Sequence, residues 1–148
     1  MAIHLNTPQA EIAGTIDERI TNLDRAVIHC IEVAREEGVN EARAHGEYTD
    51  QSGNLRSSTG GVIADKGKII SSSSFDKVKN GDEGALTGKI YLKSIVEKIL
   101  DKISLALGAG RDYAPYLQAK GRNVLGDAEE VTKRSLTKQF NDLGLKRK

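Results

Sequence analysis

The sequence predicts an α+β fold in which a long N-terminal helix and further helices pack on a small, mainly antiparallel sheet. Apolar residues recur at steps of three and four through the first third of the chain, which is the period of an amphipathic helix. The middle of the chain holds two short segments rich in β-branched residues and serine on either side of a glycine turn, which favours a hairpin. Because helices and strands do not alternate regularly, an antiparallel sheet is expected rather than a parallel one.

The composition is that of one globular domain, which we expect to span residues 1–148. Hydrophobic residues make up 38% of the chain and aromatic residues only 4%, so the core must consist of Ile, Leu, Val and Ala. The single cysteine, Cys30, cannot form an internal disulfide. The start of the chain has no basic region followed by an apolar run, and no stretch approaches membrane-spanning length. These features predict a soluble protein without a targeting segment or a membrane partner.

The first element is predicted to be an amphipathic helix from Thr15 to His45, because this stretch is almost free of Gly and Pro. Thr15 and Glu18 have the spacing of a capping box, and Gly46 would end the helix. Residues 1–14 are expected to form a flexible arm. The apolar stripe of the helix comprises Ile16, Ile20, Leu23, Val27, Ile31, Ala34 and Gly38, the last marking either a close packing contact or a break.

A hairpin is predicted next, with strands Leu55–Ala64 and Lys68–Phe75 joined by the turn Asp65-Lys66-Gly67. Gly60 and Gly61 weaken the first strand and indicate either a bulge or a point where another chain comes close. The polar, glycine-containing segment from Asp76 to Gly84 is expected to be a mobile loop.

Two helices and a third strand complete the prediction. A helix is expected from Ala85 to Leu100, and the strict alternation from Ile103 to Leu107 predicts a strand that buries Ile103, Leu105 and Leu107 on one face. Asp127 and Glu130 have the spacing of a capping box and would open a last helix that Gly144 ends. Residues 144–148 are expected to be a basic tail.

Catalytic and metal-binding patterns are weak in this sequence. His4, His29 and His45 are scattered, and none has a metal-ligand spacing to another His or to Cys30. Adjacent helix residues point about 100° apart, so His29 cannot face Cys30 as a base faces its nucleophile, and Cys30 is expected to be a packing residue. Ser57 lacks the glycine pattern of a nucleophile elbow. A hydrolase that uses Ser57 or Cys30 is kept as a third alternative.

The charge is unevenly distributed although the net charge is only +1. Residues 1–50 carry 4 basic and 10 acidic residues (net −6), residues 51–110 carry 9 and 6 (+3), and residues 111–148 carry 9 and 5 (+4). These regions either pair neighbouring copies or are solvated faces. The main alternative function is therefore a small nucleic-acid-binding or regulatory protein that uses its basic C-terminal half, with phosphate contacts from Lys133, Arg134, Lys138 and residues 146–148.

Two segments place turn-forming residues directly against stiff or aromatic ones, which is typical of a rigid surface for a partner. In the first, residues 50–58, Ser52-Gly53-Asn54 is a turn, and Arg56 would project near the end of the sheet, either to bind a carboxylate or as an ordinary surface residue. In the second, residues 112–125, Tyr113 and Tyr116 flank Pro115, either to grip another chain or to cap the end of the sheet.

In their order and spacing, the two segments resemble the tail-completion family of long-tailed bacteriophages, also called head-to-tail joining or neck proteins. The family's usual form is Thr or Ser, Gly, any residue, Leu, Arg in a turn, and Tyr-Ala-x-Tyr-Val-Glu after a strand. The resemblance covers the whole layout. It comprises the long first helix, the turn Ser52-Gly53-Asn54-Leu55-Arg56-Ser57-Ser58, the strand from Ile103 to Gly108, and the run Asp112-Tyr113-Ala114-Pro115-Tyr116-Leu117-Gln118-Ala119-Lys120-Gly121. Leu117-Gln118 stands where the family commonly has Val-Glu, so no charge role is carried over to that position.

The resemblance implies a non-enzymatic virion protein without cofactor or metal, synthesised in the host cytoplasm and located in the neck of the particle. Copies would form a ring that joins the head connector or stopper protein to the tail tube or tail terminator protein, with DNA only passing through the channel. Leu55 and Arg56 would anchor the hairpin, Tyr113 and Tyr116 would pack the loop beside it, and loop 76–84 would reach a neighbour. The interface residues by this resemblance are Gly53, Leu55, Arg56, Tyr113, Tyr116 and Lys120.

Overall fold

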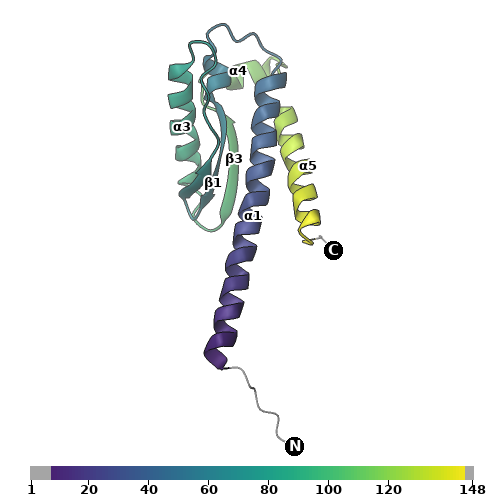
Figure 1. The fold of residues 1–148 in the computed structure, drawn as a ribbon. Coiled ribbons are helices and arrows are strands. Elements are labelled where there is room, and N and C mark those ends of the chain that lie inside the picture. Colours follow the sequence, from purple (N-terminus) through teal and green to yellow (C-terminus); the bar gives the residue numbers. More distant parts are fainter. Residues whose placement is uncertain (1–7, 146–148) are drawn as a thin grey trace, which may run out of the picture.

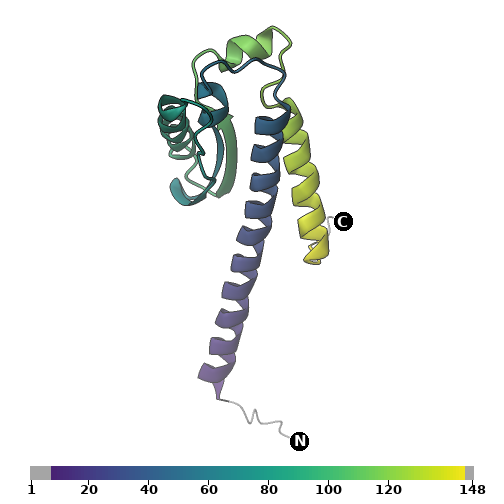
Figure 2. The ribbon, with the colours of Figure 1, turned by 45° about the horizontal axis from the view of Figure 1, so that its top comes forward.

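A computed structural model describes residues 8–145 and confirms the α+β fold (Figure 1). The small sheet lies between helix α3 on one face and helices α1 and α5 on the other, an arrangement that Figure 2 shows from a second side. The elements are α1 (Gln9–His45), α2 (Asn54–Ser58), β1 (Thr59–Asp65), β2 (Lys68–Ser72), α3 (Asp82–Val96), β3 (Ile103–Ala109), α4 (Ala114–Ala119) and α5 (Gly126–Asp142).

The first helix begins earlier than the sequence pattern predicts. α1 starts at Gln9, and the carbonyl oxygen of Pro8 accepts the backbone N–H groups of Glu11 and Ile12 at 3.0 and 3.2 Å. The predicted flexible arm is therefore wrong for residues 9–14, and residues 1–7 lie outside the described residues. The predicted capping box is also wrong, because the Thr15 hydroxyl donates to the carbonyl oxygen of Glu11 within the helix.

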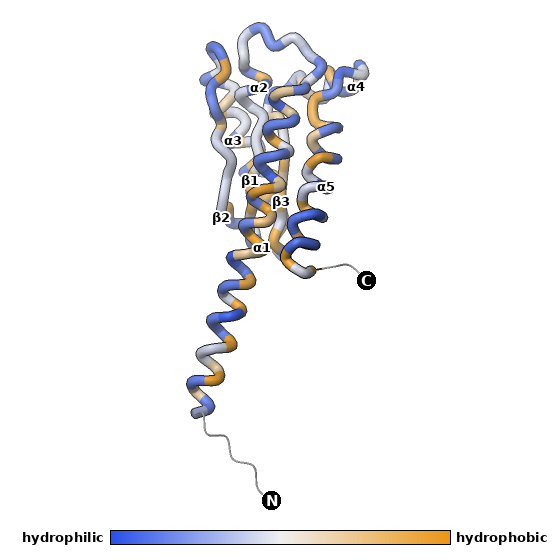
Figure 3. Tube along the Cα trace, turned by 45° about the vertical axis from the view of Figure 1, so that its right-hand side comes forward, coloured by the Kyte–Doolittle hydropathy of each residue, from blue (hydrophilic) through white to orange (hydrophobic). Residues whose placement is uncertain are grey.

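The apolar stripe of α1 is buried only in the C-terminal half of the helix. From Cys30 to Ala42 it packs on the sheet and on α5, and Gly38 makes the predicted close contact, since a Cβ there would overlap the Thr132 hydroxyl. Towards the N-terminus, Ile16, Ile20 and Leu23 are 52%, 53% and 47% exposed. A helix of 37 residues is about 55 Å long, more than twice the length of a seven-residue strand, so its N-terminal half projects beyond the body (Figure 3).

The sheet has the strand order β2-β1-β3, and both pairings are antiparallel. The predicted hairpin turn is confirmed, with positive φ at Lys66 and Gly67. The bulge lies between Ile63 and Ala64 and not at the glycines. Gly60 and Gly61 instead allow close packing within this chain, of Gly60 against the Phe75 ring and of Gly61 against Arg35 and Leu107.

The boundaries of the later elements differ from the predictions for local reasons. The predicted second strand ends at Ser72, and β3 leaves its first residue, Ile103, 44% exposed although burial was expected. α3 begins at Asp82, three residues before the predicted start at Ala85. Asp82 and Glu83 lie in its first turn, where the helix dipole favours negatively charged side chains. The capping box predicted for the last helix is absent, because the Asn123 side chain accepts the Gly126 N–H at 2.8 Å instead. α5 ends at Asp142, and residues 146–148 of the predicted tail lie outside the described residues.

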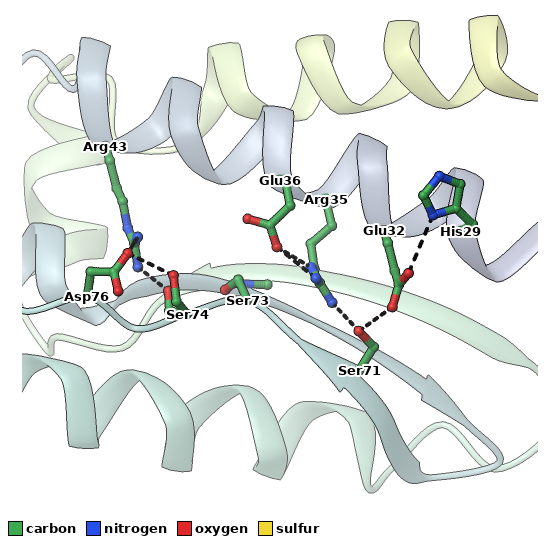
Figure 4. Close-up of polar contacts among 10 residues, drawn as sticks. His29, Glu32, Arg35, Glu36, Arg43, Ser71, Ser73, Ser74 and Asp76 are labelled. Carbon is green, nitrogen blue, oxygen red and sulfur yellow. Dashed lines mark hydrogen bonds and ion pairs between the residues drawn. The ribbon is translucent and has the colours of Figure 1, made fainter.

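Polar contacts fix α1 to the hairpin side of the sheet (Figure 4). The buried Arg35 donates to the Ser71 hydroxyl at 2.7 Å and pairs with Glu36, and the Ser71 hydroxyl donates to Glu32. Further along α1, Arg43 donates to the backbone carbonyl oxygens of Thr59 and Ser74 at 2.8 and 2.7 Å. Burial lowers the pKa of Arg43, and the nearby Asp76 carboxylate opposes this shift. The C-terminal half of α1 therefore has a fixed position relative to the sheet.

Candidate interaction surface

The segment predicted to open the first strand forms a helical turn, α2, because side chains bond its backbone. The Asp50 carboxylate accepts the N–H groups of Gly53 and Arg56, both at 2.9 Å. The hydroxyl groups of Ser58 and Thr59 donate to the carbonyl oxygen of Leu55 at 2.7 and 3.0 Å. Such local bonds compete with strand pairing. The prediction that residues 55–58 belong to the strand is therefore wrong, and β1 begins at Thr59.

Gly53 precedes α2 with a φ of +81°, in the left-handed region that favours glycine. A Cβ at this position would overlap the carbonyl group of Val78, so the loop after β2 lies directly against the turn. The Ser57 hydroxyl accepts the Val78 N–H at 2.8 Å, and Lys79 Nζ donates to the Asp50 carbonyl oxygen at 2.8 Å. The loop predicted to be mobile is thus held against α2, and residues 82–84 belong to α3.

Leu55 joins the two segments predicted to face a partner, residues 50–58 and 112–125, in the interior of the protein. It is 1% exposed and forms a buried cluster with Ala109, Ala114 and Val124. Thr59 at the start of β1 pairs with Ala109 at the end of β3, so the two segments meet at one end of the sheet. Leu55 therefore supports the surface from within and has no exposed area to offer a partner.

Arg56 lies at the border of this end of the sheet. Its guanidinium group lies over the Tyr48 ring, 5.5 Å from the ring centroid, a cation–π arrangement. No carboxylate lies within ion-pair distance of it among the described residues, so the predicted carboxylate contact within the chain is not formed. Burial raises the pKa of Tyr48, and the charge of Arg56 opposes this shift. Arg56 Nε and the Tyr48 hydroxyl are both buried and have no hydrogen-bond partner within residues 8–145.

The second segment is a short helix, α4, where a loop was expected. Its Pro115 lies in the first turn, a position that suits proline because the first N–H groups of a helix have no partner inside it. Tyr116 is 59% exposed, and Lys120 Nζ lies 4.7 Å from its ring centroid. Tyr113 is 39% exposed beneath Arg111, which forms an ion pair with Glu83 at 3.0 Å. The two rings thus form an exposed aromatic surface beside α4.

An apolar groove of about 620 Å³ follows the open edge of the sheet. β3 is an edge strand, and its Leu105 and Leu107 line the groove together with Tyr91 of α3. Leu136 and Lys133 of α5 and the first turn of α4 contribute further lining. Sequence reasoning treated Leu105 and Leu107 as core residues and missed this groove, because it depends on which strand lies at the edge.

A second surface that sequence reasoning missed is the projecting half of α1. We call residues 9–27 the arm. Its half-exposed Ile16, Ile20 and Leu23 continue the stripe that the body covers further along the helix. The arm carries Glu11, Asp17, Glu18 and Asp24 against Arg19 and Arg25, a net charge of −2. A regular apolar stripe outside the body is the kind of exposed patch that marks an interaction site.

The residues considered for thiol catalysis and for phosphate binding make contacts within the chain. Cys30 is buried, with Sγ 3.8 Å from the carbonyl oxygen of Gln139, whereas the His29 side chain is 75% exposed and lies next to Glu32. Lys133 and Arg134 form ion pairs with Glu129 and Glu130 on the same helix, and the bond from Lys133 lowers the pKa of Glu129. Within residues 8–145, no group of three or more His, Cys, Asp or Glu side chains is placed to hold a metal ion. None of the described helices is long and apolar enough to cross a membrane.

Comparison of the chain with protein-family models, with curated proteins and with solved structures finds no match.

Proposed function

We propose that this chain is a structural protein of a tailed-phage virion, which forms a ring at the neck and joins the head connector to the tail tube or tail terminator. The observation that carries the proposal is that contact surfaces lie at the two opposite ends of one molecule. The arm extends from one end, and α4 with its exposed tyrosines lies at the other (Figure 1). A ring subunit that joins other assemblies needs one surface for its neighbouring copies and another for the next component, and the two ends of this molecule offer separate surfaces.

The arm supports this role through its rigidity as well as its apolar stripe. It continues the helix that Arg35 and Arg43 fix to the sheet, so its direction is set by the body. Rigid elements lose little entropy when they bind, which suits contacts repeated in many copies. The three large apolar side chains of the arm, Ile16, Ile20 and Leu23, would be covered in the assembled ring.

The opposite end supports the role through its aromatic side chains. Tyr113 and Tyr116 combine large contact area with few rotatable bonds, which is typical of residues that dominate protein interfaces. Lys120 over the Tyr116 ring adds a positive charge to the same surface. Gly53, Leu55 and Arg56 then act behind the surface. They hold α2 and the adjoining end of the sheet in place, and only the partly exposed Arg56 reaches towards a neighbour.

The test is removal of the gene from a phage whose genome carries it. Lysates lacking the chain should contain filled heads and separate tails, and wild-type chain supplied in trans should restore joined particles. A Tyr113→Ala, Tyr116→Ala double variant should fail to restore joining, whereas a Leu86→Ala, Ile90→Ala double variant on α3, where both side chains are 61% exposed and outside the groove, should restore it. Joined infectious particles in the complete absence of the chain would refute the proposal.

The nucleic-acid alternative makes a different prediction. A phosphate binder using Lys133, Arg134 and Lys138 should bind DNA with an affinity that falls steeply as salt rises. Fluorescence anisotropy with a labelled duplex at several salt concentrations measures this directly. We expect no salt-sensitive binding, because Lys133 and Arg134 already have carboxylate partners.

A further inference from the structure

We propose that the arm of one copy binds in the groove along β3 of the next copy, so that the chain assembles head to tail. This inference deepens the proposed function, because it names the contact between neighbours in the ring. It joins two apolar surfaces that the described fold leaves open on the same chain: the stripe of Ile16, Ile20 and Leu23, and the groove lined by Leu105, Leu107 and Leu136.

The arm cannot fill the groove of its own chain. It is a continuous part of α1 and leads away from the body (Figures 1 and 3). The groove lies on the body and is lined by residues of β3, α4 and α5. Reaching its own groove would require the helix to break and reverse, and the arm contains no proline that would favour a break. The occupant that matches is therefore the arm of a second copy.

The dimensions of the two surfaces agree. From Ile16 to Leu23 the arm rises about 10 Å, and from Leu105 to Ala109 the edge strand extends about 13 Å. An amphipathic helix that places residues i, i+4 and i+7 in an apolar groove is a common mode of recognition. A groove of about 620 Å³ has room for several aliphatic side chains, and its walls are mainly aliphatic.

The arm is acidic, and one basic residue that is unpaired among the described residues lies on α5 beyond the groove. The arm carries a net charge of −2. The two charged residues that line the groove, Glu129 and Lys133, pair with each other, and Arg134 pairs with Glu130. Lys138, five residues beyond Lys133 on α5, forms no ion pair among the described residues. Asp17 and Asp24 flank the stripe on one side, one position beyond Ile16 and Leu23, so that one of them would pair with Lys138. Such a pair would favour one orientation of the arm, whereas two acidic arms would repel each other.

The contact is heterologous, because the arm and the groove are different surfaces. Heterologous contacts generate closed rings when the rotation between copies closes, and open filaments when it does not. A second copy bound in this way still presents its own arm and its own α4. The surface with Tyr113 and Tyr116 therefore remains open for another component.

Disulfide trapping tests the contact. In a Cys30→Ser background, one chain carries Ile20→Cys on the arm and a second carries Lys133→Cys at the groove. Both native side chains are exposed, so the two substitutions leave the fold intact. Mixed under mild oxidation, they should form a heterodisulfide at least tenfold faster than Ile20→Cys mixed with Ser94→Cys on the exposed side of α3. Equal rates with the two partners would overturn the inference, as would a dominant Ile20→Cys homodisulfide, which would indicate pairing between arms.

A second pair of variants checks that the apolar stripe is responsible. Adding Ile16→Glu to the arm of the trapping chain should reduce the heterodisulfide at least tenfold, with an unchanged circular dichroism spectrum. Leu86→Glu with Ile90→Glu on α3, where both side chains are 61% exposed, should leave the yield unchanged. The trapping experiment and the location of the chain in particles test different proposals. If the chain is found in the neck but the disulfide does not form, only the contact between arm and groove is refuted. If the disulfide forms but the chain is found elsewhere, only the neck function is refuted.

Discussion

The Asp50 carboxylate is the group whose loss should disturb the candidate surface most directly. It is 8% exposed and accepts the N–H groups of Gly53 and Arg56, both at 2.9 Å. In Asp50→Ala these two donors lose their acceptor, at a cost of about 1–3 kcal/mol each, and we expect unfolding free energy to fall by about 3 kcal/mol. For a domain of this size, that corresponds to a fall in Tm of about 6–12 °C.

Two matched variants separate the carboxylate from the rest of the turn. Asp50→Asn keeps one oxygen acceptor but turns an NH₂ group towards one of the N–H donors, so its loss should be about half to two-thirds that of Asp50→Ala. Ser52→Ala removes only a long, exposed bond of 3.3 Å to the Asn54 N–H and should change stability by less than about 0.5 kcal/mol. Urea unfolding followed by circular dichroism measures all three. A loss below about 1 kcal/mol in Asp50→Ala would show that water or another group replaces the carboxylate, and would refute this account of α2.

Three further predictions concern a glycine turn, a buried arginine and a half-buried tyrosine. Gly53→Ala should lower the free energy of unfolding by more than about 2 kcal/mol, because φ is +81° and a Cβ would overlap Val78. The control is Gly14→Ala in the arm. A Cβ there meets no other atom, so this variant should raise the helix content measured by circular dichroism. Arg35→Ala should lower the free energy of unfolding in urea by about 2–3 kcal/mol, because the bond to Ser71 and the packing against Gly61 are lost. Arg35→Lys keeps part of the aliphatic chain and should lose less. Equal losses in the two variants would contradict the packing contribution. The pKa of Tyr48 is raised by burial, so its stabilising effect is complete below the ordinary tyrosine pKa of about 10 and is lost as pH rises through the higher folded value. Unfolding free energy should therefore fall more steeply above pH 10 in the wild type than in Tyr48→Phe, and parallel curves would exclude this contribution.

Periodicity was sufficient to predict the architecture, because burial on one face repeats every 3.6 residues in a helix and every two in a strand. It therefore predicted the long first helix, the hairpin turn at Lys66-Gly67, the third strand and the last helix. The structure also brings residues 50–58 and 112–125 together at one end of the sheet, where Leu55 and Ala114 share a buried cluster. The interface roles of Gly53, Arg56, Tyr113, Tyr116 and Lys120 stay predictions.

The errors arose where a few specific bonds outweigh periodicity. Hydroxyl and carboxylate bonds around Leu55 replace the start of a strand with α2. The signal for this was present, since an Asp three residues before a turn glycine is typical of a side-chain-capped turn. The arm could not be predicted in the same way. An apolar stripe shows which face of a helix is apolar. How much of that face the rest of the same chain buries depends on the tertiary packing, which the pattern does not contain.

The proposed neck function is most directly tested by cryo-electron microscopy of intact particles of a phage whose genome carries this gene, with the chain labelled so that it can be located. The neck assignment predicts a ring of density at the junction of head and tail, coaxial with the DNA channel, with α4 and the arm facing different neighbours. Density confined to the capsid shell or the tail fibres, or no association with particles, would contradict it.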